Sequence, residues 1–241
     1  MQIFGHRGAP GFPRRCENTL GSFRRALECG ADGIELDVRR CGDGQIVVIH
    51  DATIDRTTNG SGLVSAFTYD QLRQFDAGDG EPAPLLAHVL DDFARRCIVH
   101  IEFKESGLLP DVLRLIVERG VQDAIAFSAF DHDDARAGAP AWDELHSAVP
   151  TVSTGLLATP SKVQRIGVEG YIRAASRLNA SALHVARQAV DRDLVELAHA
   201  AGLAVRVFTV NALDEVRHFQ TIGADAIFTD FPEQARSLVP R

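Results

Sequence analysis

The chain has 241 residues, of which 45 % are hydrophobic and 24 % are charged, a composition typical of globular proteins that argues against a disordered or fibrous chain. Its 33 acidic and 25 basic side chains give a net charge of −8 at pH 7, which argues against nucleic acid as a partner. No apolar run approaches the about 18 residues of a membrane span, so we expect no membrane-spanning segment.

Short β-prone runs alternate with helical patterns along the whole sequence. The first run lies directly at the N-terminus, where neither a basic segment nor a long apolar core indicates a signal peptide, and we therefore expect a cytoplasmic protein. The predicted strands of this alternation are Gln2–Gly5, Asp32–Val38, Cys97–Phe103, Ala124–Ser128, Val152–Leu157, Ala182–Val185, Ala204–Val210 and Ala226–Thr229. The predicted helices are Thr19–Cys29, Leu86–Arg95, Leu109–Arg119, Lys162–Leu178, Arg192–Ala201, Leu213–Ile222 and Pro232–Leu238. Between the fourth and fifth strands, Gly138 and Pro140 interrupt the helical pattern of Asp131–His146.

Eight strand–helix units in a chain of this length predict an α/β fold, namely a (β/α)8 TIM barrel whose parallel sheet is covered by helices. We interpret residues 1–241 as a single domain, because no linker-like stretch divides them. Neither GxGxxG nor GxxxxGK[ST] follows the first strand, which argues against a nucleotide-binding open sheet. In a TIM barrel catalytic groups lie at the carboxyl ends of the strands, so polar residues at those ends are the candidates for a site.

One feature breaks the alternation after the second strand. Asp43-Gly44 stands between that strand and the β-prone run Ile46–Ile49, and Asp-Gly between two such runs is a strong hairpin signal. We therefore predict that Ile46–Ile49 returns antiparallel to the second strand, outside the barrel. The Gly-, Asp- and Thr-rich segment that follows completes a hairpin and loop insertion over residues 39–84, which we expect to lie over the barrel mouth.

The predicted hairpin brings ionisable residues to one face. A two-residue turn pairs Gly42 with Gln45 and places Asp37 directly opposite His50, where side chains lie about 5 Å apart. Glu35 precedes Asp37 by two positions and therefore points the same way. The hairpin thus predicts two carboxylates and an imidazole on one face, although a bulge in the turn would shift the pairing.

The third barrel strand continues this pattern. Its alternation places Ile101 and Phe103 toward the helices, and it places His100, Glu102 and Lys104 toward the barrel axis. Ionisable groups inside a barrel are unfavourable unless they are paired or bind a metal. We therefore expect this strand to contribute to a charged site at its carboxyl end.

Together, the strand ends predict a mouth that holds carboxylates, cationic side chains and imidazoles: Glu35, Asp37, Glu102, Arg7, Lys104, His6 and His50. Crowded carboxylates repel one another and need a cation, and their oxygen ligands favour Mg²⁺ or Ca²⁺ over zinc. Arginine and lysine are donors that suit a phosphate. Two histidines suit a reaction that needs one base and one acid near neutral pH. These residue types in combination indicate metal-dependent cleavage of a phosphodiester.

Short motifs follow one another in a fixed order: His6-Arg7-Gly8, Glu17-Asn18-Thr19, Ile34-Glu35-Leu36-Asp37-Val38, Val47-Val48-Ile49-His50-Asp51, Arg56-Thr57-Thr58, Ile101-Glu102-Phe103-Lys104, Ser128-Ala129-Phe130-Asp131, Phe208-Thr209-Val210-Asn211 and Thr229-Asp230-Phe231-Pro232. In this order, and over almost the whole chain, the sequence resembles the glycerophosphodiester phosphodiesterase family. The resemblance implies a barrel fold and hydrolysis of a small-molecule glycerophosphodiester to sn-glycerol 3-phosphate and an alcohol. It also implies a divalent cation on Glu35, Asp37 and Glu102, with Mn²⁺ as a further candidate besides Mg²⁺ and Ca²⁺.

The same resemblance implies roles for the other polar residues of the predicted mouth. It implies catalysis by His6 and His50, with Arg7 and Lys104 at the phosphate, and we favour His6 as the acid and His50 as the base. The family usually has tryptophan where Phe208 stands, so we expect Phe208 to line an apolar wall around the alcohol group and to affect substrate preference.

Two other functions stay open. One is a lysophospholipase D-like or other phospholipase headgroup phosphodiesterase on the same barrel, and the other is a catalytically silent barrel that binds phosphorylated polyols. Four further points stay open at this stage: the preferred alcohol, the physiological metal, the oligomeric state, and whether the nucleophile is water or the neighbouring glycerol hydroxyl. We expect Asn18 and Thr19 to cap the first helix and Arg56 to hold the insertion in place, whereas Asp230 suits a structural role and a substrate-binding role equally.

Overall fold

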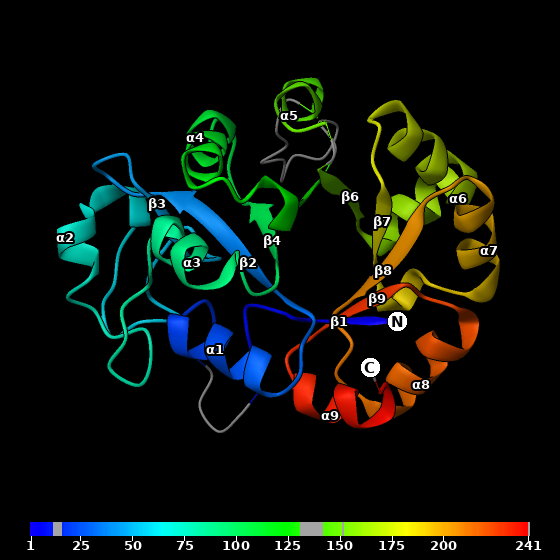
Figure 1. Ribbon diagram of the computed structural model, residues 1–241, viewed down its shortest axis with the longest axis horizontal. Coiled ribbons are helices and arrows are strands. Elements are labelled where there is room, and N and C mark those ends of the chain that lie inside the picture. Colours follow the sequence, from blue (N-terminus) through cyan, green and yellow to red (C-terminus); the bar gives the residue numbers. More distant parts are fainter. Residues whose placement is uncertain (12–15, 131–141, 151, 241) are drawn as a thin grey trace.

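A closed barrel of parallel strands forms the centre of the molecule, which the computed structural model describes over residues 1–11, 16–130, 142–150 and 152–240 (Figure 1). The barrel strands are β1 (Gln2–Gly5), β2 (Gly33–Arg40), β4 (Ile98–Phe103), β5 (Ile125–Phe130), β6 (Ser153–Ala158), β7 (Ala182–Ala186), β8 (Ala204–Phe208) and β9 (Ala226–Thr229). Neighbours pair in parallel, and the ring closes because β1 pairs with both β2 and β9. The predicted TIM barrel is therefore confirmed, with strand bounds close to those predicted.

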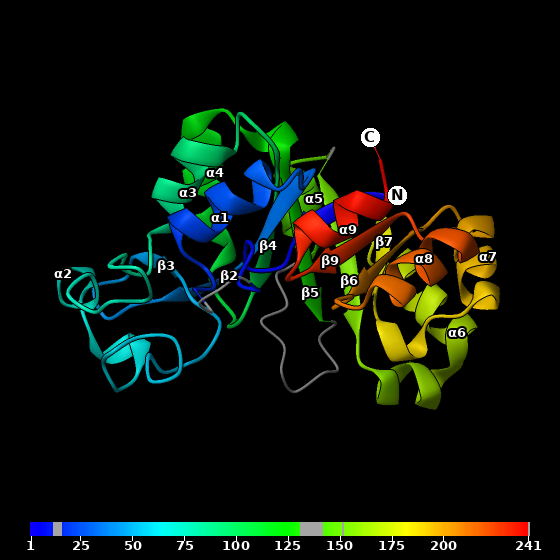
Figure 2. The ribbon, with the colours of Figure 1, turned by 90° about the horizontal axis from the view of Figure 1, so that it is seen from below.

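Helices cover the outside of the barrel (Figure 1 and Figure 2). They are α1 (Leu20–Glu28), α3 (Leu86–Phe93), α4 (Leu109–Arg119), α5 (Trp142–Ala148), α6 (Pro160–Arg177), α7 (Arg192–Ala200), α8 (Leu213–Ile222) and α9 (Pro232–Leu238). Thr19 caps α1 as predicted, because its side chain accepts the backbone N–H of Ser22. Residues 131–141, which include the interrupted part of the predicted pattern and Asp131 of the Ser-Ala-Phe-Asp motif, lie outside the described residues. Within the described ranges, no helix has the length and apolar character that crossing a membrane requires.

Apolar side chains fill two layers, one between the strands and the helices and one inside the barrel. In the outer layer, Ile34 of β2 and Phe23 of α1 belong to one buried cluster. Inside the barrel, Phe4 stacks on Phe228 with 5.4 Å between the ring centroids. The ring of His100 packs edge-on against both of these rings, so β4 presents His100 to the barrel axis as predicted.

The insertion after β2 has a small apolar core of its own. It contains β3 (Ile46–Val48), a 3₁₀ turn (Val64–Ala66) and α2 (Tyr69–Leu72), and it lies beside β2 at one side of the barrel (Figure 1). Its buried cluster includes Cys41, Val47, Ile49, Ile54, Val64, Tyr69, Leu72 and Ala83. This packing holds the insertion in a defined conformation, so side chains on it can be placed reproducibly at the strand ends.

The predicted register of the hairpin is wrong by one residue. The antiparallel pairs of β2 and β3 bring Ile49, rather than His50, opposite Asp37, and the Ile49 N–H donates to the Asp37 carbonyl oxygen at 2.9 Å. The turn spans residues 42–44 instead of two residues, and Gly44 adopts a left-handed φ of 86°. A three-residue turn that ends in a left-handed glycine is a common hairpin type, and it shifts the pairing as a bulge does. Because β3 ends at Val48, the chain leaves the ladder before His50.

Candidate active site

Three carboxylates gather where the parallel strands β2 and β4 run side by side. Glu35 and Asp37 lie on β2 and Glu102 lies on β4, and the parallel register pairs Asp37 with Glu102. One oxygen of each of these residues lies within 4.8 Å of the others. Glu35 and Asp37 are buried, at 4 % and 1 % exposure. The structure thus brings together the three acids that the sequence predicted as metal ligands.

The crowding of these acids changes the ionisation of two of them. Burial and the neighbouring charge of Asp37 raise the pKa of Glu35 to about 8. Burial also opposes ionisation of Asp37, but the charges of Lys104 and Arg7 outweigh it and hold the pKa of Asp37 below its ordinary value. Lys104 Nζ lies 3.0 Å from Asp37 Oδ1 and also forms an ion pair with Glu102. The three acids offer oxygen ligands alone, and this donor set fits a divalent cation such as Mg²⁺ or Ca²⁺.

Arg7 lies among the same carboxylates. Its backbone adopts a left-handed φ of 55°, and its backbone N–H donates to Glu35 Oε2 at 2.9 Å. Its guanidinium lies with Nε 3.3 Å from Asp37 Oδ2 and donates from Nη1 to Glu17 Oε1 at 2.8 Å. The guanidinium is therefore fixed on two sides beside the three acids, next to the position of a bound cation.

His6 follows β1 and is held by an aspartate from the opposite end of the chain. Its Nδ1 lies 2.7 Å from Asp230 Oδ1, and Asp230 Oδ2 accepts a hydrogen bond from Asn211 Nδ2 at 2.7 Å. Burial opposes the ionisation of Asp230, but its hydrogen bond and charge interaction with His6 outweigh that effect and lower its pKa. Asp230 is therefore an acceptor at neutral pH, and His6 carries the proton on Nδ1. Burial lowers the pKa of His6, but Asp230 and the charge of Glu35 raise it by more.

His50 has a matching partner on the insertion. Its Nδ1 lies 2.6 Å from Asp51 Oδ1, and the hydrogen bond from Arg56 is the largest cause that lowers the pKa of Asp51 to about 2. Asp51 is therefore a carboxylate at neutral pH, so Nδ1 of His50 donates to it and Nε2 is left as the free acceptor of the neutral ring. Burial lowers the pKa of His50, and the positive charges of Lys104 and Arg7 lower it further. These charge interactions also show that His50 lies near the acids despite the shifted register.

A narrow pocket inside the barrel mouth joins His6 to two of the acids. It is lined by His6, Glu35, Glu102, Ser128, Leu157, His184, Phe208 and Phe228. The predicted residue Phe208 thus lies on an apolar wall that faces the carboxylates. Deeper in the barrel, His184 Nε2 accepts a hydrogen bond from Arg206 Nη1 at 3.3 Å, and the His184 ring lies beside Gly155, where a Cβ would overlap it. Gly155 therefore makes the space that His184 occupies.

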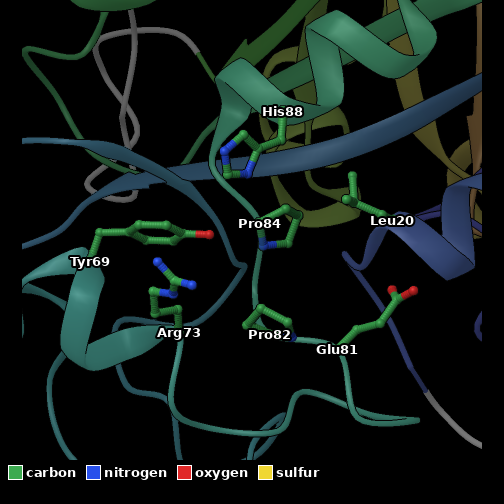
Figure 3. A pocket seen from close by; sticks show the side chains of 7 residues that line it. All are labelled: Leu20, Tyr69, Arg73, Glu81, Pro82, Pro84 and His88. Carbon is green, nitrogen blue, oxygen red and sulfur yellow. The ribbon is translucent and has the colours of Figure 1, made fainter.

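A second pocket, of about 480 Å³, lies in a different part of the molecule. Figure 3 shows side chains from α1, α2, α3 and the segment before α3 around it, and they are Leu20, Tyr69, Arg73, Glu81, Pro82, Pro84 and His88. The lining contains neither the three acids nor the two histidines. The candidate active site is therefore the narrower pocket at the strand ends, where the carboxylates and imidazoles meet.

Several residues of the site were not predicted from the sequence. Asn18 was expected to cap a helix, but it is buried and donates from Nδ2 to Asp37 Oδ2 at 2.9 Å. Asp51 and Asp230 orient the two histidines, and their positions directly after His50 and directly after a strand were the available signals. Glu17 accepts from two arginines, and nothing in its local sequence pattern indicates that role.

Comparisons with known proteins point to one family. A sequence profile of the glycerophosphoryl diester phosphodiesterase family matches residues 6–234. A relative from Bacillus altitudinis named glycerophosphodiester phosphodiesterase is 33 % identical over 97 % of this chain and 96 % of its own length. A relative of the same name from Caldanaerobacter subterraneus subsp. tengcongensis is also 33 % identical, over 98 % of this chain and 97 % of its own length. A phosphodiesterase structure from Oleispira antarctica, in complex with the product sn-glycerol-3-phosphate, is 27 % identical with a TM-score of 0.81 and covers 100 % of this chain and 97 % of its own. A glycerophosphodiester phosphodiesterase structure from Agrobacterium tumefaciens is 26 % identical with a TM-score of 0.80, over 98 % of this chain and 99 % of its own.

Proposed function

We propose the reaction of this chain from its family: it belongs to the glycerophosphoryl diester phosphodiesterase family and is a glycerophosphodiester phosphodiesterase. It hydrolyses its substrate to sn-glycerol 3-phosphate and an alcohol by metal-dependent histidine catalysis. The observation that carries the proposal is the cluster of three strand-end acids with two aspartate-bound histidines beside it. The complex of the Oleispira relative with sn-glycerol-3-phosphate supports the same product here.

The carboxylates of Glu35, Asp37 and Glu102 would hold the divalent cation, for which Mg²⁺, Ca²⁺ and Mn²⁺ are the candidates. Such a cation, when bound, neutralises negative charge on the phosphate oxygens as the transition state forms. Arg7 and Lys104 add fixed positive charge beside the acids, and we assign them to the non-bridging oxygens of the phosphate. The guanidinium offers a planar fork and the ammonium a point charge, which suits two different oxygens of one phosphate.

The two histidines divide the proton transfers. His50 has a lowered pKa and a free Nε2, so it is the group that removes a proton from the nucleophile. His6 has a raised pKa and therefore holds the proton that the leaving alkoxide needs. Environments that move two pKa values apart in this way are characteristic of acid/base pairs. The nucleophile is water or the neighbouring glycerol hydroxyl, and detection of a cyclic phosphate intermediate distinguishes the two routes.

Phe208 lies in the pocket beside Glu35 and Glu102, and we assign it to the apolar surface that receives part of the alcohol group. An aromatic ring offers a large apolar contact area and little hydrogen bonding. It therefore selects among alcohols by shape and apolar contact. A small molecule, rather than a macromolecule, fits a pocket of this width.

The experiment that tests the function measures release of glycerol 3-phosphate from several glycerophosphodiesters. The purified chain is assayed after chelation and again with added Mg²⁺, Mn²⁺ or Ca²⁺. We expect release that depends on the added cation. Failure to release glycerol 3-phosphate under every condition would remove the proposal and leave the phosphopolyol-binding barrel. Faster cleavage of lysophospholipids than of glycerophosphodiesters would favour the lysophospholipase D-like alternative.

A further inference from the structure

Arg56 of the insertion contacts two carboxylates at once. Its Nε donates to Asp51 Oδ2 at 2.6 Å, and its Nη2 reaches Asp51 Oδ1 at 3.2 Å. Its Nη1 and Nη2 donate to the two oxygens of Glu17 at 2.8 Å and 2.7 Å. The guanidinium thus forms a two-point contact with each acid, a geometry that fixes both carboxylates in orientation as well as in position.

Each of these carboxylates holds a residue of the candidate active site. The Oδ1 of Asp51 lies 2.6 Å from Nδ1 of His50. The Oε1 of Glu17 accepts a hydrogen bond from Nη1 of Arg7 at 2.8 Å. A continuous chain of charge-assisted contacts therefore runs from His50 through Asp51, Arg56 and Glu17 to Arg7.

The surroundings make this chain stronger than an ordinary surface ion pair. Isolated exposed pairs contribute little, whereas two-point contacts within a network contribute more. The side chain of Glu17 is only 12 % exposed, and that of Arg56 is 47 % exposed. The hydrogen bonds that Arg56 donates to Glu17 and Asp51 raise the pKa of Arg56, and the one to Glu17 lowers the pKa of Glu17 against the effect of burial. Arg56 and Glu17 therefore stabilise each other in their charged forms.

We propose that Arg56 is a positioning residue that sets the orientation of His50 and of Arg7 together, through Asp51 and Glu17. Its guanidinium holds Asp51 as the acceptor of the Nδ1 proton, so that His50 presents Nε2 to the substrate. It also holds Glu17 in the orientation that fixes the Arg7 guanidinium beside the acids. The kinetic consequence rests on the proposed function, whereas the effect on His50 itself does not.

The role makes a specific demand on side-chain chemistry. Arg56→Gln removes the positive charge and the planar guanidinium that makes a two-point contact with each acid. We expect kcat to fall about 10- to 100-fold, as is common when a partner of a site residue is lost. Arg56→Lys keeps the charge but offers no planar fork, so we expect it to restore only part of the lost kcat. Arg73→Gln is the matched control, because Arg73 is an exposed arginine on the same insertion that pairs with Asp70.

A second readout does not depend on turnover. The groups whose charges act on His50 are Asp37, Lys104, Arg7 and Asp51. Arg56→Gln removes the positive charge that pairs with Asp51. The Asp51 carboxylate then stabilises the protonated His50 ring more strongly, so the pKa of His50 rises in this variant. Nitrogen-15 NMR of labelled histidine, with the His50 signal identified by its absence in His50→Ala, measures both the pKa and the tautomer.

The experiment therefore compares wild type, Arg56→Gln, Arg56→Lys and Arg73→Gln by kcat, by the thermal midpoint and by the His50 NMR titration. The inference predicts a raised His50 pKa and a mixed tautomer in Arg56→Gln, a partial return in Arg56→Lys and no change in Arg73→Gln. A folded Arg56→Gln with wild-type kcat and an unchanged His50 titration would overturn it. If wild type releases no glycerol 3-phosphate but the His50 titration still shifts, the proposed function fails and the positioning role stands.

Discussion

The backbone N–H of Arg7 donates to Oε2 of Glu35 at 2.9 Å, so the first strand of the barrel fixes a carboxylate of the second. Arg7 itself adopts a left-handed φ of 55° at this position. A side chain that is already fixed loses little freedom when it binds a cation. This arrangement pre-forms the candidate metal site before any ion enters.

Removal of divalent cations should abolish activity, and added Mg²⁺, Ca²⁺ or Mn²⁺ should restore it. We also expect a higher thermal midpoint with the cation, because it offsets the burial and the repulsion from Asp37 that raise the pKa of Glu35 to about 8. A cation at about 100 times its Kd stabilises the folded state by about 2.7 kcal/mol. Asp37→Asn and Glu102→Gln should lose both effects, whereas Asp91→Asn, at an exposed ion pair with Arg119, should keep them. A chelated enzyme with full activity contradicts the metal assignment.

The pH dependence of kcat/KM should be bell-shaped. His50 must be neutral to act as a base, so activity is lost as pH falls through its pKa, which lies below 6.5. His6 must be protonated to act as an acid, so activity is lost as pH rises through its pKa, which lies above 6.5. His50→Ala and His6→Ala should each lower kcat by about 10²- to 10⁴-fold.

The two histidine variants also separate the limbs of that profile. The residual activity of His50→Ala should lack the acidic limb, and that of His6→Ala should lack the alkaline limb. Circular dichroism serves as the control for folding, which we expect both variants to keep because the two imidazoles are 20 % and 32 % exposed. Loss of the opposite limb in each variant would reverse the acid and base assignments.

Replacement of Phe208 should change substrate preference more than turnover. Phe208→Ala removes apolar contact from the pocket wall, so we expect KM to rise about tenfold with a small change in kcat. Phe208→Trp should change the ratio of kcat/KM between glycerophosphodiesters with small and bulky alcohols. Leu197→Ala, at an exposed position of α7, is the control. Equal preference in wild type and both Phe208 variants would exclude this residue from the alcohol site.

Gly155→Ala should destabilise the barrel through one identifiable contact. The new Cβ would overlap the buried His184 ring, and overpacking of this kind costs about 1–3 kcal/mol. The free energy of unfolding in urea measures the effect. In a His184→Ala background the ring is absent, so the same substitution should cost much less. An equal cost in both backgrounds would show that the destabilisation has another source.

The sequence predicts those parts of the site that depend on the alternation of a strand. Glu35 and Asp37 lie within β2, Glu102 lies near the end of β4 and Lys104 directly follows it, and their common direction follows from the two-residue period of β structure. His6 is predicted in the same way, because it directly follows β1. The direction of these side chains follows from regular strand geometry alone, so it can be predicted without knowledge of their contacts or packing.

The remaining parts depend on backbone choices that the local sequence leaves open. The Asp-Gly pair fits a two-residue and a three-residue turn, and the left-handed Gly44 decides the register. Asn18 precedes a helix, where a capping role fits as well as the observed bond to Asp37. The contacts of Arg56 with Glu17 and Asp51 require the folded path of the insertion, which its own apolar cluster determines.

The bond between His6 and Asp230 spans 224 residues of sequence and crosses the seam where β1 and β9 meet. A chain in which β9 is not paired with β1 therefore lacks the contact that orients His6, the proposed proton donor. Closure of the barrel and orientation of the His6 ring thus depend on the same pair of strands. A circular permutant that joins the original termini and opens the chain between His6 and Asp230 would bring these two residues close together in the sequence.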